Sequence, residues 1–343
     1  MPTSTRFDNG RALRVQTADR VFDIIRQGPI PSYHSAVWQP FTDKHAQLGG
    51  APGAPMAPDG FPEQAGSGRR VRYQNGAIYE RRDGGTAWVY GMIGHRYDEL
   101  GGPVGWLGMP LTDESDLPEG GRISVFEHGA IYWWPDVGAI DLNDVVVHYT
   151  GLLCFGETDS DGDDTPFEDE PYVILGVVAP TGSAEVRSQI YGDVDAGDVR
   201  QDNIELYRGR PSGLVIGVQL MEHDFGDPDK FKEHVRKFVE KASVAVEKGL
   251  EYVPVVGPVL SDIAEAVLPY LKEPITDFLN STLGTDDDDL GQTVLTLSVK
   301  QMVVLAARTP NSDHYGVGFK AQTELLGSEQ GATYKACFGL VAV

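Results

Sequence analysis

Apolar and polar residues alternate along two stretches of the chain that are copies of one another. Residues 68–79 recur as residues 121–132, and the Leu-Gly-Gly triplet at 48–50 recurs at 100–102, a period of 52 to 53 residues. In both copies the alternation is interrupted by a short turn, at Asn75-Gly76 and at His128-Gly129. This pattern predicts a β-hairpin in each copy, with the turn glycine at a positive φ. Residues 46–143 are therefore interpreted as a tandem repeat.

The second copy resembles an LGFP repeat, a short module of actinobacterial cell-wall proteins. The residues that carry the resemblance are Leu100-Gly101-Gly102, Trp106-Leu107-Gly108-Met109-Pro110, Gly121-Arg122, Phe126 and Gly129 to Trp134. The first copy matches less well, since Gly53-Ala54-Pro55 stands at the Leu-Gly-x-Pro element and Glu80 replaces the first Trp. The resemblance implies that residues 46–143 bind cell-wall polysaccharide. Residues 1–45 are interpreted as an N-terminal arm or a degenerate repeat.

Aromatic side chains are the candidate glycan-binding residues of this module, because a ring offers a large apolar face with a polar rim. The candidates are Tyr79, Trp88, Trp106, Tyr132, Trp133 and Trp134. The alternative is that a repeat buries its aromatic rings against a neighbouring unit. Trp133 and Trp134 point to opposite faces in a strand, so one of them is expected in the core and the other at the surface.

From residue 144 the pattern changes to β-branched and apolar runs separated by polar segments. Runs at 144–155, 172–178, 213–224 and 294–297 predict strands, and 302–307, 316–321 and 332–339 are interpreted as closing strands with a turn at 327–331. The expected fold class is mainly β, with the repeats followed by an antiparallel β-sandwich over residues 144–343.

An acidic segment separates the first two of these predicted strands. Eight carboxylates fall within residues 157–170 with no Lys or Arg among them. Such crowding is relieved by a multivalent cation, and calcium accepts many carboxylate oxygens in flexible geometry. Residues 157–168 can be laid on the EF-hand template, but the flanks are typical of strands and the first position is Glu rather than Asp.

Three features in order resemble a C2 domain. They are Asp159-Ser160-Asp161-Gly162 followed by Asp169 to Val173, the strand 213–224, and Asp286 to Gln292 followed by an apolar strand. The resemblance implies a composite Ca²⁺ site built from distant loops. Its candidate ligands are Glu157, Asp159, Asp161, Asp164, Asp224, Asp227, Asp288 and Asp289. Zinc is not favoured, because the histidines and cysteines lack zinc-ligand spacing.

Residues 228–284 interrupt the sandwich pattern with apolar residues at helical spacing, and basic residues surround the first of the predicted helices. Two interpretations compete for this insertion. It is either a membrane-active or partner-binding helical hairpin, or a small subdomain that packs on the sandwich.

Charge and composition remove several classes of function. The net charge of −23 leaves no basic stripe for nucleic acid. Neither a signal peptide nor a membrane-spanning segment is expected from the sequence, and its two cysteines, Cys154 and Cys337, are free thiols or form one bridge.

No nucleophile elbow, P-loop or Cys-His signature is present, so we expect a binding protein and not an enzyme. The expected function is calcium-dependent binding of an envelope glycan at an extracellular or cell-surface location. Two alternatives stay open: a membrane-active toxin or effector that uses the insertion, and a carboxylate-dependent glycoside hydrolase of cell-wall polysaccharide.

Overall fold

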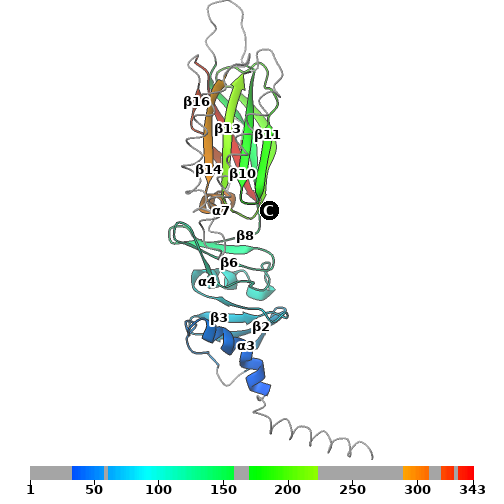
Figure 1. The fold of residues 1–343 in the computed structure, drawn as a ribbon, viewed down its shortest axis with the longest axis vertical. Coiled ribbons are helices and arrows are strands. Elements are labelled where there is room, and N and C mark those ends of the chain that lie inside the picture. The colour runs from blue at the N-terminus through cyan, green and yellow to red at the C-terminus, as the bar shows by residue number, and fades with distance from the viewer. Residues whose placement is uncertain (1–32, 58–60, 158–169, 223–288, 309–317, 328–330) are drawn as a thin grey trace, which may run out of the picture. The chain divides into compact units, whose positions relative to one another are not determined.

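The protein is mainly β, with four antiparallel sheets and three α-helices in the part of the chain that is described (Figure 1). A computed structural model describes residues 33–57, 61–157, 170–222, 289–308, 318–327 and 331–343. The chain divides into two compact units, Met1–Tyr90 and Gly91–Val343. The prediction of a mainly β fold is confirmed.

The described residues of the first unit form a helix followed by a four-stranded meander, which we call repeat 1 (residues 33–90). Its elements are α3 (Tyr33–Gln47), β1 (Glu63–Ala65), β2 (Gly68–Tyr73), β3 (Gly76–Glu80) and β4 (Thr86–Val89), with the strands in sheet order β1-β2-β3-β4. Phe41 of α3 packs on Val71, Tyr73 and Ile78 of the meander. This cluster forms because the strand alternation places these three apolar side chains on one face of the sheet.

The second unit begins with the same arrangement, repeat 2 (residues 91–142). Its elements are α4 (Gly91–Glu99), the 3-10 turn η1 (Gly102–Val104), β5 (Ser115–Leu117), β6 (Gly121–Val125), β7 (Ala130–Trp134) and β8 (Gly138–Leu142), with the strands in sheet order β5-β6-β7-β8. The residue pairs Arg69↔Glu80 in repeat 1 and Arg122↔Trp133 in repeat 2 occupy the same place in the register. The tandem repeat read from the sequence is thus a structural repeat.

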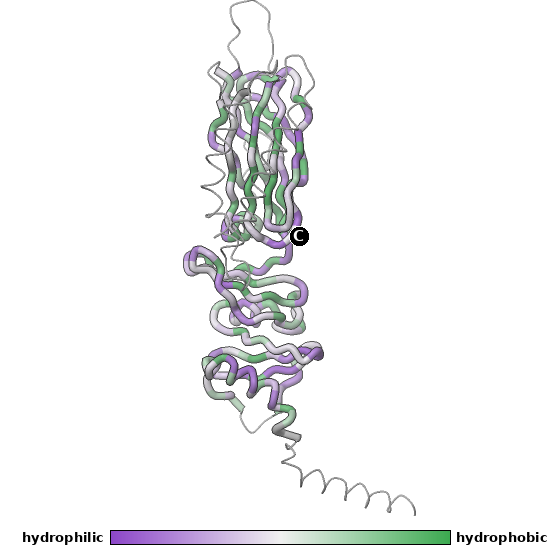
Figure 2. The backbone as a smooth tube through the Cα atoms, in the orientation of Figure 1, coloured by the Kyte–Doolittle hydropathy of each residue, from purple (hydrophilic) through white to green (hydrophobic). Residues whose placement is uncertain are grey.

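The rest of the second unit is a sandwich of two antiparallel sheets. One sheet has the order β11-β10-β13-β14 and the other β12-β9-β17-β15, with β16 also paired to β17. The strands are β9 (Val145–Gly156), β10 (Pro171–Ala179), β11 (Gly182–Arg187), β12 (Val199–Gly209), β13 (Leu214–Glu222), β14 (Asp289–Leu297), β15 (Ala321–Gln322), β16 (Leu326–Gly327) and β17 (Thr333–Ala342). Hydrophobic residues recur along these strands in Figure 2.

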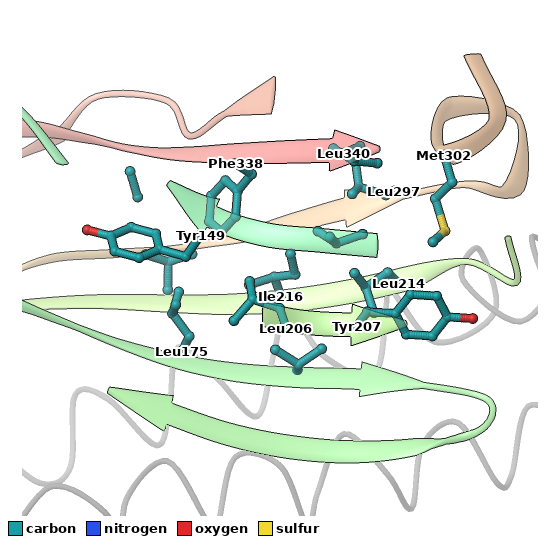
Figure 3. Close-up of a cluster of buried hydrophobic side chains, with 14 of the residues drawn as sticks. Tyr149, Leu175, Leu206, Tyr207, Leu214, Ile216, Leu297, Met302, Phe338 and Leu340 are labelled. Atoms are coloured by element: carbon teal, nitrogen blue, oxygen red, sulfur yellow. The ribbon is translucent and has the colours of Figure 1, made fainter. Parts of the chain in front are cut away.

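The sandwich core lies between the two sheets. Tyr149 and Phe338 from one sheet meet Leu175 and Ile216 from the other in a single buried cluster (Figure 3). The cluster continues through Met302 of helix α7 (Val299–Ala307) to the aromatic rings of β7. Repeat 2 and the sandwich therefore share one hydrophobic core.

Helix α7 corrects one prediction, because residues 302–307 were expected to form a strand. A capping box starts the helix, with Ser298 accepting from the Gln301 N–H and the Gln301 side chain accepting from the Ser298 N–H. The buried residues Val299, Met302, Val303 and Ala306 follow helical spacing. An apolar run of this length fits either element, and the cap decides for the helix.

Gly129 corrects a second prediction. Gly76 has the expected positive φ of 95°, but Gly129 does not adopt a positive φ. A Cβ at Gly129 would lie 2.8 Å from the Trp106 ring, so this position needs glycine for space.

The cysteines are both free and buried. They lie on the adjacent strands β9 and β17, but Cys154 belongs to the sandwich core while Cys337 packs with Leu153 in a separate cluster. Burial raises the pKa of the Cys337 thiol to about 12.

Several predictions fall outside the described residues. These are residues 1–32 of the predicted arm 1–45, residues 158–169 of the acidic segment and the insertion 228–284. Within the described part, no helix is long and apolar enough to cross a membrane.

Candidate functional site

Each repeat places a Gly-x-Pro segment beside the hairpin turn between its two central strands. Gly53 and Gly108 both have a positive φ, of 79° and 71°. In repeat 1 the Ala54 N–H donates to the Gln74 side chain at 3.2 Å, and in repeat 2 the Met109 N–H donates to Glu127 Oε2 at 2.8 Å. This equivalence fixes the structural correspondence of the two repeats.

The helix that precedes each Gly-x-Pro segment is tied to it by one aromatic side chain. His45 Nε2 donates to the Gly53 carbonyl at 2.8 Å, and the Tyr97 hydroxyl donates to the Gly108 carbonyl at 2.7 Å. The two rings also contact aromatic residues of the meander: His45 stacks on Tyr73, and Tyr97 packs at a tilt against Phe126, which follows β6. Helix and meander are therefore held together by the same device in both repeats.

Trp106 is the most exposed of the six predicted aromatic residues, with 43% of its surface accessible. It follows the turn η1, in a segment three residues longer than its counterpart in repeat 1. The indole N–H donates to Asp141 Oδ2 at 3.2 Å. Gly129 lies against the ring, where any larger residue would clash. The indole is thus held in place while part of its surface stays open to solvent.

A short polar network fixes Asp141, the carboxylate that accepts the indole hydrogen bond. Arg96 of α4 donates from Nε to Asp141 Oδ1 at 2.8 Å and lies 3.1 Å from Glu99 Oε2. These hydrogen bonds, that of Asp141 first, raise the pKa of Arg96. We call Arg96, Trp106, Gly129 and Asp141 the Trp106 site. An aromatic ring beside a planar carboxylate and a guanidinium suits a sugar, which needs an apolar contact and directed hydrogen bonds.

Repeat 1 arranges its aromatic residues differently at the same corner. Ala51 stands two residues before Gly53, where Trp106 stands before Gly108, and Trp88 occupies the register position of Asp141. The Trp88 indole donates to the Asn75 carbonyl at 2.7 Å and stacks on Tyr90 at 3.8 Å between centroids. Both rings are half-buried.

The other predicted aromatic residues divide by burial. Trp133 is half-buried on β7, whereas Tyr79, Tyr132 and Trp134 are 3%, 1% and 0% exposed. The Trp134 indole donates to the Pro118 carbonyl at 3.0 Å, and its ring lies parallel to that of Tyr132 at 6.3 Å. A buried ring offers no face to a ligand, so Trp88, Trp106 and Trp133 are the candidates that the structure leaves accessible.

The predicted metal ligands lie almost entirely outside the described residues. Glu157 is exposed and directly follows β9, and Asp289 begins β14. Those outside are Asp159, Asp161, Asp164, Asp224, Asp227 and Asp288. Among the described residues no group of three His, Cys, Asp or Glu side chains could hold a metal ion. The calcium site stays a prediction.

Sequence reasoning missed Arg96 and Asp141. They are 45 residues apart and neither belongs to a local motif, so only the fold brings them together. The signal that pointed to this corner was Gly129, which was assigned to a turn although its role is to admit the Trp106 ring.

The LGFP repeat family matches this chain over residues 53–105 and 107–146, which contain both meanders. No curated protein matches the chain. The predicted resemblance to LGFP repeats is confirmed over this region, whereas the resemblance to C2 domains stays a prediction. LGFP repeats are typical of surface or cell-wall associated proteins, and the match suggests a module of that kind over these residues.

Proposed function

We propose that the protein binds a polysaccharide of the bacterial cell envelope through the Trp106 site, and that the sandwich adds a calcium-dependent C2-like module. The protein acts in this proposal as a binding protein at an extracellular or cell-surface location, and not as an enzyme. The observation that carries it is the exposed indole of Trp106, held by Asp141 and Gly129 within a region that matches LGFP repeats.

The combination of apolar and polar groups at the Trp106 site supports a glycan as the ligand. The Trp106 ring supplies the apolar contact, while Asp141, which accepts from the indole, and Arg96, which donates to Asp141, supply an acceptor and a donor. Because the salt bridge from Arg96 to Asp141 already fixes these groups, little side-chain freedom is lost on binding. A rigid aromatic residue with preorganised polar neighbours is a common centre of binding energy.

The test is a binding measurement with isolated cell-wall polysaccharide and the Trp106→Ala variant. Loss of a central aromatic contact costs about 2 kcal/mol or more, so we expect roughly a thirtyfold loss of affinity. The matched control is Phe155→Ala, which removes an exposed ring from the sandwich. Equal affinity of the wild type and Trp106→Ala for every envelope polysaccharide would reject the proposed site.

Strand register supports the calcium part of the proposal. Pro171 of β10 pairs with Glu222 of β13, and Met221 next to it pairs with Asp289 of β14. The chain segments 157–170 and 223–288, which contain all the predicted ligands except Asp289, therefore adjoin the same end of this sheet as Asp289 does. Carboxylates from separate loops suit Ca²⁺, which takes six to eight oxygen ligands.

Thermal unfolding tests the calcium part separately from glycan binding. Calcium at a hundred times its dissociation constant stabilises the folded state by about 2.7 kcal/mol, which raises Tm by roughly 5–10 °C. The variants Asp224→Asn and Asp288→Asn should reduce this shift, and magnesium should not reproduce it. Asp195→Asn, at an exposed carboxylate of the sandwich, is the matched control. An unchanged Tm between calcium and chelator would remove calcium from the proposal.

A further inference from the structure

Repeat 1 contains a polar cavity whose lining includes no aromatic residue. Its volume is about 330 Å³, and it lies at the β1–β2 turn and the end of β3. The residues that line it are Gln64, Ser67, Gly68, Arg69, Glu80, Arg81 and Arg82. The lining thus combines three guanidinium groups and one carboxylate with an amide and a hydroxyl.

The three arginines differ in how far their charge is already balanced. Arg69 donates from Nε to Glu80 Oε2 at 2.7 Å, and Glu80 is buried. Arg81 lies across the turn at Gly85, with its Nε 3.3 Å from Asp83 Oδ1. Arg82 is exposed and takes part in no ion pair formed by the described residues. One cationic side chain at the rim is therefore available for a ligand.

The cavity also lies in a basic region of an acidic protein. Residues 61–90 contain five arginines, at positions 69, 70, 72, 81 and 82, and three carboxylates, Glu63, Glu80 and Asp83. This local excess of two positive charges contrasts with the net charge of −23. Anions are repelled by most of the molecule, so a local basic surface selects where an anionic ligand binds.

Repeat 2 does not reproduce this chemistry. Trp133 and Trp134 occupy the positions of Glu80 and Arg81, and Pro135 follows where repeat 1 has Arg82. The basic cavity is therefore confined to repeat 1 and is not a general requirement of the repeat fold.

We propose that this cavity binds the anionic group of an acidic saccharide, either a carboxylate or a phosphate carried by the sugar chain. Both groups accept paired hydrogen bonds from guanidinium donors in a planar fork. Gln64 and Ser67 supply neutral hydrogen-bonding groups for adjacent hydroxyls. The inference is independent of the Trp106 site, which uses an aromatic face in repeat 2.

Isothermal titration of the full chain tests this proposal with three ligands: a trimer of galacturonic acid, an oligomer of glycerol phosphate and a neutral trisaccharide of galactose. We expect at least one anionic oligomer to bind more tightly than the neutral one. This binding should weaken in about 0.5 M salt, because the Debye length is then only a few ångströms and the attraction between charges is screened. The anionic ligand that binds identifies carboxylate or phosphate as the natural group.

Variants separate the cavity from general electrostatic attraction. Arg82→Gln should weaken binding at least tenfold without changing Tm, since Arg82 is exposed and makes no ion pair with described residues. Arg72→Gln removes the same charge from the same sheet but does not line the cavity, so it should change affinity less than threefold. Absence of anion binding, or equal losses in these two variants, would overturn the proposal. The Trp106→Ala measurement with cell-wall polysaccharide tests the proposed function alone, because Trp106 does not line the cavity, so the failure of one proposal is distinguishable from the failure of the other.

Discussion

The two repeats share a backbone plan and differ in what their side chains do. In both, a helix is tied to a Gly-x-Pro segment by an aromatic residue, His45 in one and Tyr97 in the other. Trp133 of repeat 2 and Glu80 of repeat 1 occupy equivalent positions in the strand register. The residues that follow them, Trp134 and Arg81, are therefore equivalent as well. One residue is buried in a core and the other lines a polar cavity. The repeat plan therefore sets the backbone, and single positions decide what each copy contacts.

The contrast follows from what lies beside each sheet. Trp134 belongs to the same buried cluster as Met302 of α7, so the face of repeat 2 that carries Trp134 is buried against the sandwich. Lys300 of α7 also forms ion pairs with Asp136 and Glu119 of repeat 2. The segment after η1, which is longer than its counterpart in repeat 1, carries the exposed Trp106. The aromatic residues of an LGFP-like repeat thus serve either packing or exposure, according to position.

Among the substitutions that test this difference between the repeats, Trp134→Ala is expected to lower the unfolding free energy most. The indole is fully buried and hydrogen-bonded to the Pro118 carbonyl, so its loss leaves a cavity in the shared core. Truncating a buried Trp costs about 3–5 kcal/mol of unfolding free energy. Urea unfolding of the full chain, followed by circular dichroism, measures the change.

Trp133→Ala is the matched control, since it removes the same side chain one residue away on the other, half-buried face. It should lower the unfolding free energy clearly less than Trp134→Ala does. Similar losses for both variants would contradict the assignment of Trp134 to the junction between repeat 2 and the sandwich.

The sequence revealed the repeats because glycine and aromatic positions recur at one spacing. Gly76 and Gly129 stand at the same place in the two copies, yet one provides a positive φ and the other provides space for an indole. Spacing identifies equivalent positions, but it does not tell which steric demand each glycine meets. That demand depends on Trp106, which only repeat 2 brings to this corner.

Helix α7 shows a second limit of pattern reading. Residues 302–307 are apolar throughout, so they carry neither helical nor strand alternation. The deciding signal lay outside the run, in the capping pair Ser298 and Gln301. The Trp106 site shows the third limit, because Arg96 and Asp141 meet through the fold and not through any spacing. Local chemistry was predictable here, and long-range polar pairs were not.

A smaller effect is expected where the repeats are most alike, at the ring that ties helix to meander. Tyr97→Phe keeps the ring contact with Phe126 but removes the hydrogen bond to the Gly108 carbonyl, which is buried. An unsatisfied buried carbonyl costs about 1–3 kcal/mol, so the unfolding free energy should fall by that amount. Urea unfolding again gives the value.

The matched control is Tyr132→Phe, because the Tyr132 ring is equally buried and its hydroxyl makes no hydrogen bond within the described part of the chain. Its removal should change the unfolding free energy by less than about 0.5 kcal/mol. Tyr97→His, which installs the residue of repeat 1, should recover part of the loss if an imidazole N–H can replace the hydroxyl as donor. If Tyr97→Phe were as stable as the wild type, the hydrogen bond to Gly108 would not stabilise the repeat. The helix would then be held to the meander by ring packing alone, and the hydrogen bond common to the two repeats would have no role in stability.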